Sequence, residues 1–416
     1  MSFRRVVVTG LGAITPIGNN VEEFWNSLGN GVSGAAPITL FDSSKFKTRF
    51  ACEVKNFDPL QFIDRKEARR MDRFTQFAMV VSDEAIRHSG LDLEKLNKDR
   101  VGVIWGSGIG GLKTFQDEVS NFAKGDGTPR FNPFFIPMMI SDIAAGYISI
   151  KYSFRGPNFA VVSACATSTH SISDAFHFIK LGKADVMVTG GSEACVIEAA
   201  IGGFNSMKAL SERNDDPSTA SRPFDLNRDG FVLGEGAGAL ILEELEFAKA
   251  RGAKIYGEVV GCGASADAYH LTAPHPDGIG ATNVMRFALE DAGMKPEDID
   301  YINVHGTSTP LGDPQEIKAI QNIFGEHAYR LNISATKSMT GHLLGGAGVI
   351  EALACIMAIN KGIIPPTINH FTDDPVIDPK LNLTFNTAQK REVRAALSNT
   401  FGFGGHNASL IIKKFD

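Results

Sequence analysis

The 416-residue chain has few cysteines, no long apolar run and no excess of positive charge. Its five cysteines form no Cys-x-x-Cys pair, which indicates a reducing compartment rather than a disulfide framework. No stretch approaches the roughly 20 apolar residues of a membrane span, and the valines after Arg5 are too few for a signal-peptide core. The net charge of −6 opposes a general nucleic-acid binder.

One stretch of the sequence combines a strand pattern, a tight corner and a helix pattern around Cys165. The apolar run 159–162 predicts a buried strand. A small-residue corner, 163–166, follows it, and apolar residues then recur at helical spacing: Ile172, Ala175, Phe176 and Ile179. At the start of a helix, unpaired N–H groups and the helix dipole lower a thiol pKa and can bind an oxyanion. Cys165 is therefore a candidate nucleophile, and the alternative is a small buried hydrophobe.

The rest of the first half alternates between strand and helix patterns. A strand is predicted at the N-terminus, ending in the turn Gly10-Leu11-Gly12, and residues 72–88 have the periodicity of an amphipathic helix. Further strand-like runs lie at 101–105, 185–189 and 230–242. Gly106, Gly108 and Gly111 have the G-x-G-x-x-G spacing, but no clear ribose-binding acid stands about 20 residues on at a strand end, which argues against dinucleotide binding.

The second half repeats features of the first. A strand into a glycine turn is predicted at 255–263, and residues 333–337 resemble 162–165 in pattern. The C-terminal run 404–412 likewise resembles 234–242. These similarities predict two α/β units, 1–252 and 253–416, with strands alternating with helices. A site shared by such units is expected where they meet.

Three polar residues of the second half lie on loops after short apolar runs: His305, Lys337 and His342. Gly306 follows His305, Ser338 follows Lys337 and Gly341 precedes His342, so backbone can approach a ligand there. A thiol with two imidazoles can be acylated and can stabilise a developing anion. A zinc site from Cys165, His305 and His342 is the alternative, although the glycine corners fit a substrate cleft better.

A basic stripe is predicted on a helix, at the spacing three and four: Arg65, Lys66, Arg69, Arg70 and Arg73. Nearby carboxylates make a solvated face the ordinary interpretation. The functional interpretation is a docking surface for an acidic protein or a phosphate group.

Four dispersed motifs give the sequence a family resemblance. They are Ala164-Cys165-Ala166-Thr167-Ser168, His305-Gly306-Thr307-Ser308-Thr309, Lys337-Ser338-Met339-Thr340-Gly341-His342 and Phe401-Gly402-Phe403-Gly404-Gly405. In this order they resemble the condensing enzymes of the thiolase superfamily, specifically the β-ketoacyl-[acyl-carrier-protein] synthases of type II. The Cys-His-His set is unlike type III, and the glycine loop lacks the second cysteine of thiolases.

The resemblance implies the thiolase fold, with duplicated βαβαβαββ halves in a five-layered αβαβα sandwich, and a homodimer. It implies that Cys165 takes an acyl chain from the 4′-phosphopantetheine arm of acyl carrier protein. Malonyl-carrier protein then loses carbon dioxide, with His305 and His342 stabilising the enolate and Lys337 polarising their surroundings. The carbanion attacks the acyl-Cys165 thioester and gives 3-oxoacyl-carrier protein, as in fatty acid elongation.

Further roles come from the same resemblance. The N–H groups of Cys165 and Phe403 would form the oxyanion hole, and the loop of Phe401 and Phe403 would gate the acyl pocket. Substrate-binding positions are Ile109, Thr307, Thr309 and Gly402. Carrier-protein docking positions are Lys66, Arg69, Arg70 and Lys208. No cofactor is required, although Glu351 would support either Lys337 or a structural cation.

One departure and two alternatives accompany the resemblance. His406 stands where the family usually has threonine, so an extra imidazole adjoins the gating loop; a tolerated loop residue is the simpler interpretation. The core motifs are shared with ketosynthases of polyketide or specialised-lipid synthesis. A non-catalytic chain-length factor is disfavoured because those proteins replace the nucleophile. We expect a bacterial cytoplasmic protein, whose preferred chain length depends on the pocket near Ile109 and Phe403.

Overall fold

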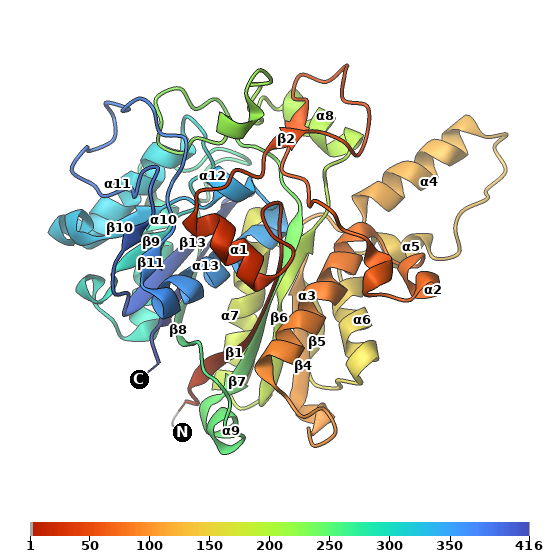
Figure 1. Cartoon of the computed structure of the whole chain (residues 1–416), viewed down its shortest axis with the longest axis horizontal. Coiled ribbons are helices and arrows are strands. Elements are labelled where there is room, and N and C mark those ends of the chain that lie inside the picture. Colours follow the sequence, from red (N-terminus) through yellow and green to blue (C-terminus); the bar gives the residue numbers. More distant parts are fainter. Residues whose placement is uncertain (1–2, 416) are drawn as a thin grey trace.

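The computed structural model describes residues 3–415 and contains one ten-stranded sheet to which both halves of the chain contribute (Figure 1). Its order is β10-β9-β13-β14-β8-β1-β7-β6-β4-β5. The first half supplies β1 (Val6–Ile14), β4 (Val101–Gly106), β5 (Asn158–Val161), β6 (Val186–Glu193) and β7 (Gly236–Glu244). The second half supplies β8 (Gly257–Ala266), β9 (Tyr301–Asn303), β10 (Asn332–Ser334), β13 (Ala395–Gly402) and β14 (His406–Lys413). Two-stranded ribbons are formed by β2 (Ala36–Pro37) with β3 (Phe50–Ala51) and by β11 (Ile363–Ile364) with β12 (Gln389–Lys390).

The two halves of the sheet have the same topology. In each, the first strand pairs antiparallel with the fifth, and the second strand pairs parallel with the third and the fourth. The halves join where β1 and β8 pair antiparallel over residues 6–8 and 257–259. The duplication predicted from the sequence is therefore confirmed at the level of strand order and direction.

Helices form three layers around the two halves of the sheet. α7 and α13 pack between the halves, α3 and α6 cover the outer face of the first, and α10 covers the second with α11 against it (Figure 1). The first-half helices are α1 (Val21–Gly29), α2 (Arg65–Ala68), α3 (Arg73–Ser89), α4 (Leu112–Lys124), α5 (Phe135–Met139), α6 (Ile143–Tyr152), α7 (Thr167–Lys180), α8 (Glu198–Ser206) and α9 (Leu245–Ala250). The second-half helices are α10 (Ile279–Ala292), α11 (Gly312–Phe324), α12 (Lys337–Thr340) and α13 (Ala347–Lys361). This is the predicted five-layered thiolase arrangement.

The central layer contains a long apolar helix. The segment Leu344–Lys361, which includes α13, is long and apolar enough to cross a membrane, a property that the sequence analysis overlooked. However, 89% of that segment is buried inside the fold. Its apolar surface is used by packing against β13, β7 and α7, so it is the core helix of the sandwich.

The glycines of β1 have a packing role rather than the predicted turn role. The strand continues through Gly10 and Gly12 to Ile14. A Cβ at these glycines would lie 2.2 Å from the carbonyl oxygen of Ala85 and 2.0 Å from that of Val81, both on α3. The predicted turn is therefore wrong, because these glycines let a helix backbone approach the strand. Gly261 and Gly263 of β8 meet α10 at similarly short distances, which repeats the arrangement in the second half.

The strand before Cys165 is at the edge of the sheet and not buried as predicted. β5 ends the strand order, and Phe159 and the adjoining Val162 are 36% and 59% exposed. The apolar composition of residues 159–162 predicts a buried strand. In the structure it forms an apolar, unpaired sheet edge, which normally requires a cover.

Candidate functional site

A cavity of about 610 Å³ opens where the two halves meet. Ile109 and Cys165 line it from the first half, and His305, His342 and Phe403 line it from the second. The candidate nucleophile and both candidate imidazoles therefore share one cleft, although 140 residues or more separate the cysteine from either histidine in the sequence.

Cys165 lies on a strained corner between β5 and α7. A single helical turn, Ala164–Ala166, joins the strand to the helix, and Ala164 has φ +51°, in the left-handed region. The Ser163 N–H donates to the Thr167 hydroxyl at 2.8 Å and fixes the corner. This arrangement places the cysteine at the start of α7, as the sequence predicted, with only 7% of its surface exposed.

The predicted lowering of the Cys165 thiol pKa is wrong. Burial raises its pKa to about 12, and the Lys337 ammonium and the Phe403 backbone N–H only partly oppose this effect. The cysteine packs in an apolar cluster that includes Cys195, Ile197 and Leu344, so removing the thiol from water outweighs the helix dipole. The resting group is therefore a thiol rather than a thiolate.

His305 and His342 present two neutral imidazoles to the cleft. Their ring centroids are 5.2 Å apart and the rings are nearly perpendicular, at 86°. Burial lowers both pKa values well below the ordinary 6.5, and the Lys337 charge lowers them further. Each Nδ1 is buried without a hydrogen-bond partner among residues 3–415. A tautomer with the proton on Nε2 therefore leaves no buried N–H unpaired and offers a donor to a substrate.

The backbone of His342 is held by the segment before β7. Its N–H donates to the Val232 carbonyl at 2.8 Å, and its carbonyl accepts from the Gly234 N–H at 2.9 Å. The strand limb predicted over 230–242 is thus split: residues from 236 form β7, and the preceding ones support His342. On the other side, the Glu316 carboxylate accepts from the backbone N–H groups of His305 and Gly306.

Lys337 lies outside the lining of the cleft and forms an ion pair with Glu351. Burial raises the pKa of Glu351 to about 7, an effect that the Lys337 ammonium opposes. Of the two roles considered for Glu351, the structure shows the contact with Lys337. Lys337 thus acts on both histidines through its charge rather than by contact with a substrate.

Gly402, at the end of β13, abuts the corner that holds Cys165. A Cβ at this position would lie 2.8 Å from the Ser163 carbonyl oxygen and 3.1 Å from the Cys165 nitrogen. The neighbouring Phe401 ring lies 5.6 Å from the His305 ring, and Phe401, Gly402 and Phe403 all line the cleft. Only glycine lets β13 come this close to Cys165.

The loop after Phe403 is tied to another loop across the mouth of the cleft. The Gly404 N–H donates to the Leu271 carbonyl at 2.7 Å, and the Gly405 carbonyl accepts from the Asp267 N–H at 2.9 Å. Both glycines have positive φ, +88° and +76°. His406 is exposed, and its ring lies over Gly404.

Comparisons with known proteins identify the family. The N-terminal domain profile of β-ketoacyl synthases matches residues 3–248, and the C-terminal domain profile matches residues 256–371. The chain belongs to the β-ketoacyl synthase family.

Named relatives cover nearly the whole of this β-ketoacyl synthase. It is 53% identical to 3-oxoacyl-[acyl-carrier-protein] synthase 2 of Synechocystis sp., over 99% of this chain and 98% of the relative. It is 51% identical to the Staphylococcus aureus protein of the same name, over 99% of each. The family predicted from the motifs is confirmed.

Solved structures agree with the sequence relatives. A β-ketoacyl synthase from Burkholderia phymatum matches with a TM-score of 0.92 at 34% identity, over 99% of this chain and 100% of that one. The ishigamide ketosynthase/chain length factor matches with a TM-score of 0.93 at 36% identity, over 100% of both chains. The predicted thiolase-type fold is therefore confirmed.

The remaining predicted substrate positions also line the cleft of the synthase. Thr307 and Thr309 are on the side of the second half, with their hydroxyl oxygens 3.2 Å apart, and Ile109 is on the side of the first. Lys208 follows α8 at another part of the mouth, with φ +53°.

The sequence analysis missed Glu193, the last residue of β6. Its buried carboxylate accepts from the N–H groups of Gly108, Ile109 and Gly345 at 2.8, 3.2 and 3.0 Å. It thus connects the loop that bears Ile109 to the loop after His342. The sequence does contain a signal for this residue: a carboxylate stands at the end of an apolar strand. Burying a carboxylate without hydrogen-bond partners is unfavourable, so a buried one is expected to have a role.

The predicted basic stripe is partly wrong. Lys66 and Arg69 are exposed and Arg70 lies over the Phe134 ring, but Arg73 turns inward to an ion pair with the buried Glu235 at 2.7 Å. The helix breaks between α2 and α3, so a continuous helical stripe does not form.

The zinc alternative has no geometric support. Within residues 3–415, no three His, Cys, Asp or Glu side chains are grouped so that they could hold a metal ion. Whether the enzyme needs a cofactor is a separate matter and stays a prediction.

Proposed function

We propose that the chain catalyses the decarboxylating Claisen condensation of acyl-carrier protein with malonyl-carrier protein in fatty acid elongation. The observation that supports this reaction is the shared cleft, in which one cysteine at a helix start faces two neutral imidazoles. The names of the relatives at 51–53% identity support the same substrates.

The first half-reaction acylates Cys165. The sulfur attacks the carbonyl carbon of the acyl thioester, the bond to the carrier thiolate breaks, and the thiol proton passes to that leaving group. Negative charge develops on the carbonyl oxygen in between. The N–H group of Cys165 lies at the start of α7, and that of Phe403 lies just after the end of β13. Both can donate to this oxyanion.

The second half-reaction uses His305 and His342. Carbon dioxide leaves the malonyl group, and the electron pair of the broken bond forms an enolate on the thioester. Two Nε2–H donors stabilise the enolate oxygen without becoming charged themselves, which the lowered pKa values favour. The enolate carbon then attacks the acyl-Cys165 carbonyl, the Cys165 thiolate leaves and takes a proton from water to restore the thiol, and a 3-oxoacyl-carrier protein is released.

The carrier protein is the proposed macromolecular partner. A polyketide synthase structure with a TM-score of 0.89 at 33% identity contains a ketosynthase with its acyl carrier protein. In the present chain, Lys66, Arg69, Arg70 and Lys208 provide cationic positions on two elements of the surface, and family carrier proteins are acidic. Thr307 and Thr309 provide hydroxyls for the amides of the pantetheine arm.

A homodimer through β5 is also proposed. The free edge of β5 carries the exposed Phe159, and Val162 follows it. Pairing of two β5 edges would extend the sheet and cover these residues. Light scattering of the wild type and of Val162→Lys tests this proposal, since a monomeric wild type contradicts it.

Two further expectations stay predictions. A structural cation near Glu351 is compatible with its buried, unpartnered Oε2 atom, but the Lys337 ammonium already balances the carboxylate charge. A cytoplasmic location follows only from the sequence resemblance.

A ketosynthase of polyketide synthesis is the second candidate, because the ketosynthase of a type II polyketide synthase matches at 33% identity. The higher identity to fatty acid enzymes favours the first candidate. A non-catalytic chain-length factor is disfavoured by the presence of Cys165, His305 and His342 in one cleft.

Intact-protein mass spectrometry tests the proposal. Wild type and Cys165→Ala are mixed with acyl-carrier proteins of fatty acid and polyketide type. One acyl mass on the wild type and none on the variant supports Cys165 as nucleophile, and the preferred carrier separates the two candidates. Wild type that gains no mass although it is folded overturns the proposal.

A further inference from the structure

The loop that carries Thr307 and Thr309 has an unusual backbone and little regular structure of its own. Ser308, between the two threonines, is buried with φ +67°, in the left-handed region. Its hydroxyl accepts from the Arg222 N–H at 3.0 Å and its carbonyl accepts from the Gly230 N–H at 3.1 Å. Contacts from residues 222–230 therefore hold the loop in a conformation that serine rarely adopts alone.

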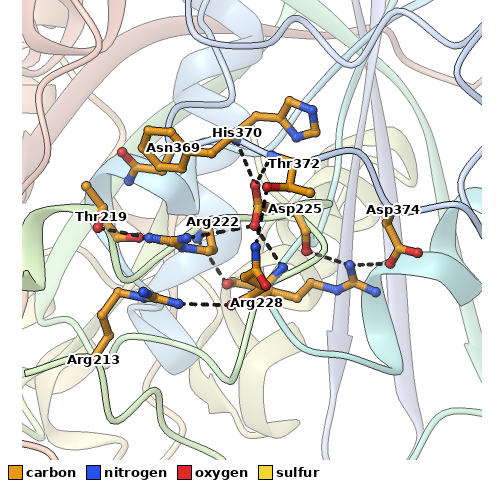
Figure 2. Close-up of polar contacts among 12 residues, drawn as sticks. Arg213, Thr219, Arg222, Asp225, Arg228, Asn369, His370, Thr372 and Asp374 are labelled. Atoms are coloured by element: carbon orange, nitrogen blue, oxygen red, sulfur yellow. Dashed lines mark hydrogen bonds and ion pairs between the residues drawn. The ribbon is translucent and has the colours of Figure 1, made fainter.

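The most extensive of these contacts come from the Arg228 side chain (Figure 2), which is only 4% exposed. Its Nε donates to the Thr309 carbonyl at 2.9 Å, and one terminal nitrogen donates to the Pro310 carbonyl at 3.1 Å. The other terminal nitrogen donates to the Asp225 carbonyl at 2.8 Å and to the Asp374 carboxylate at 2.6 Å. One planar group thus fixes two consecutive carbonyls of the cleft loop.

Asp313 completes the arrangement around Thr309. Its carboxylate lies 3.7 Å from the Arg228 Nε and accepts from the Thr309 N–H at 3.2 Å. The backbone of Thr309 is therefore held on both sides, by a cation at the carbonyl and by an anion at the N–H. The threonine hydroxyl adjoins the Thr307 hydroxyl in the lining of the cleft.

Arg228 is itself anchored to a third segment of the chain. The Asp225 carboxylate accepts from the N–H groups of Phe371 and Thr372 at 2.7 and 2.8 Å, and the Leu226 N–H donates to the Thr372 carbonyl at 3.0 Å (Figure 2). Asp374 also belongs to this segment. The Arg228 guanidinium is therefore held by Asp225 on its own segment and by Asp374 on the segment around Thr372. A small displacement of Arg228 would consequently move the cleft loop.

We propose that Arg228 is a positioning residue for substrate binding: through the carbonyls of Thr309 and Pro310 it sets the Thr307 and Thr309 hydroxyls against the amide groups of the substrate arm. This inference rests on the proposed function, because it requires a thioester carried on an amide-containing arm. Arg228 does not line the cleft and has no direct part in bond making.

Arg222 provides a matched control for Arg228. It belongs to the same network, and its side chain is 7% exposed (Figure 2). However, the hydrogen bonds of its guanidinium go to Thr219, and its other contacts are to Asp225 and the Phe371 ring. An arginine-to-lysine change there perturbs the network without removing a donor from the Thr309 or Pro310 carbonyl.

The test compares wild type, Arg228→Lys, Arg222→Lys and Asp374→Asn in the full chain. Two rates at Cys165 are measured: acylation by acyl-carrier protein, and alkylation by iodoacetamide, which has no pantetheine arm. A lysine ammonium keeps the charge but does not reproduce the planar fork. We expect Arg228→Lys to raise the KM for acyl-carrier protein about tenfold or more, with kcat and the alkylation rate within about twofold of wild type.

Asp374→Asn keeps the arginine and loosens its anchor, so it is expected to shift KM in the same direction by about threefold; it serves if Arg228→Lys does not fold. Arg222→Lys is expected to match wild type. Equal losses of acylation and alkylation in Arg228→Lys, or equal effects of the two lysine variants, overturn the positioning role. Wild type that is alkylated but never acylated overturns the proposed function and this inference with it.

Discussion

Lys337 and Glu351 meet as an ion pair in the interior, where each side chain is only 2% exposed. The pair lies behind the two cleft histidines, and the lysine charge acts on both of them and on Cys165. The charge that acts on the site thus comes from a residue that does not line the cleft.

Removing one partner of this pair is expected to be costly. Glu351→Ala leaves a buried ammonium without a counter-charge, so the free energy of unfolding should fall by about 3–5 kcal/mol. The double variant Lys337→Met, Glu351→Leu should recover most of this stability while losing condensation activity. Urea unfolding and an assay of malonyl decarboxylation measure the two effects. A stable Glu351→Ala protein contradicts the assignment of a charged pair.

The pH dependence of Cys165 reactivity follows from its raised pKa of about 12. Below that value the folded protein holds a thiol, and the reactive thiolate fraction rises about tenfold per pH unit. Iodoacetamide alkylation of Cys165 should therefore increase steadily from pH 7 to pH 10 without a plateau. Lys337→Met should slow it at every pH, since the ammonium lowers the thiol pKa. A plateau near neutral pH would show that a thiolate is already present in the resting enzyme.

Gly402→Ala should damage the nucleophile corner by steric overlap alone. The new methyl carbon would lie 2.8 Å from the Ser163 carbonyl oxygen, so β13 or the corner must shift. A displacement of about 1 Å at a reacting group lowers rates by roughly 100-fold. The matched control is Gly29→Ala, where no atom lies within 4 Å of the added carbon. Acylation rates of both variants are compared, and similar rates would refute the steric argument.

Glu193→Gln should alter chain-length preference. The carboxylate accepts from three N–H groups, among them that of Ile109, and an amide replaces one acceptor by a donor. The Ile109 loop is then expected to move, and the acylation profile over donors of several lengths should change. Glu243→Gln, equally buried but paired with Thr9 and Arg251, serves as the control. An unchanged profile in Glu193→Gln argues against the loop connection.

Much of the site was predictable because Cys165 and His305 each follow an apolar run and precede small residues, and because His342 lies in a motif of the family. The parts that failed depend on tertiary contacts. Gly10 has the local pattern of a turn, yet its role is set by α3, which is distant in the sequence. The Cys165 pKa likewise depends on burial, which local spacing does not report.

The partners of buried arginines were also not predictable from the sequence. The inward ion pair of Arg73 with Glu235 and the role of Arg228 depend on which segments meet in the fold. Neither residue differs in local sequence from an ordinary surface arginine.

The pairing of β1 with β8 has a consequence for how such an enzyme can be divided. β1 is the last strand of the first half of the sheet at this junction, and β8 is the last strand of the second half. Either half expressed alone would therefore expose an unpaired strand edge there. The first fragment would keep Cys165, the proposed nucleophile, and the second would keep both histidines. Neither fragment could complete a catalytic cycle, and complementation in a cell would require both pieces to be synthesised together and to assemble along that one seam.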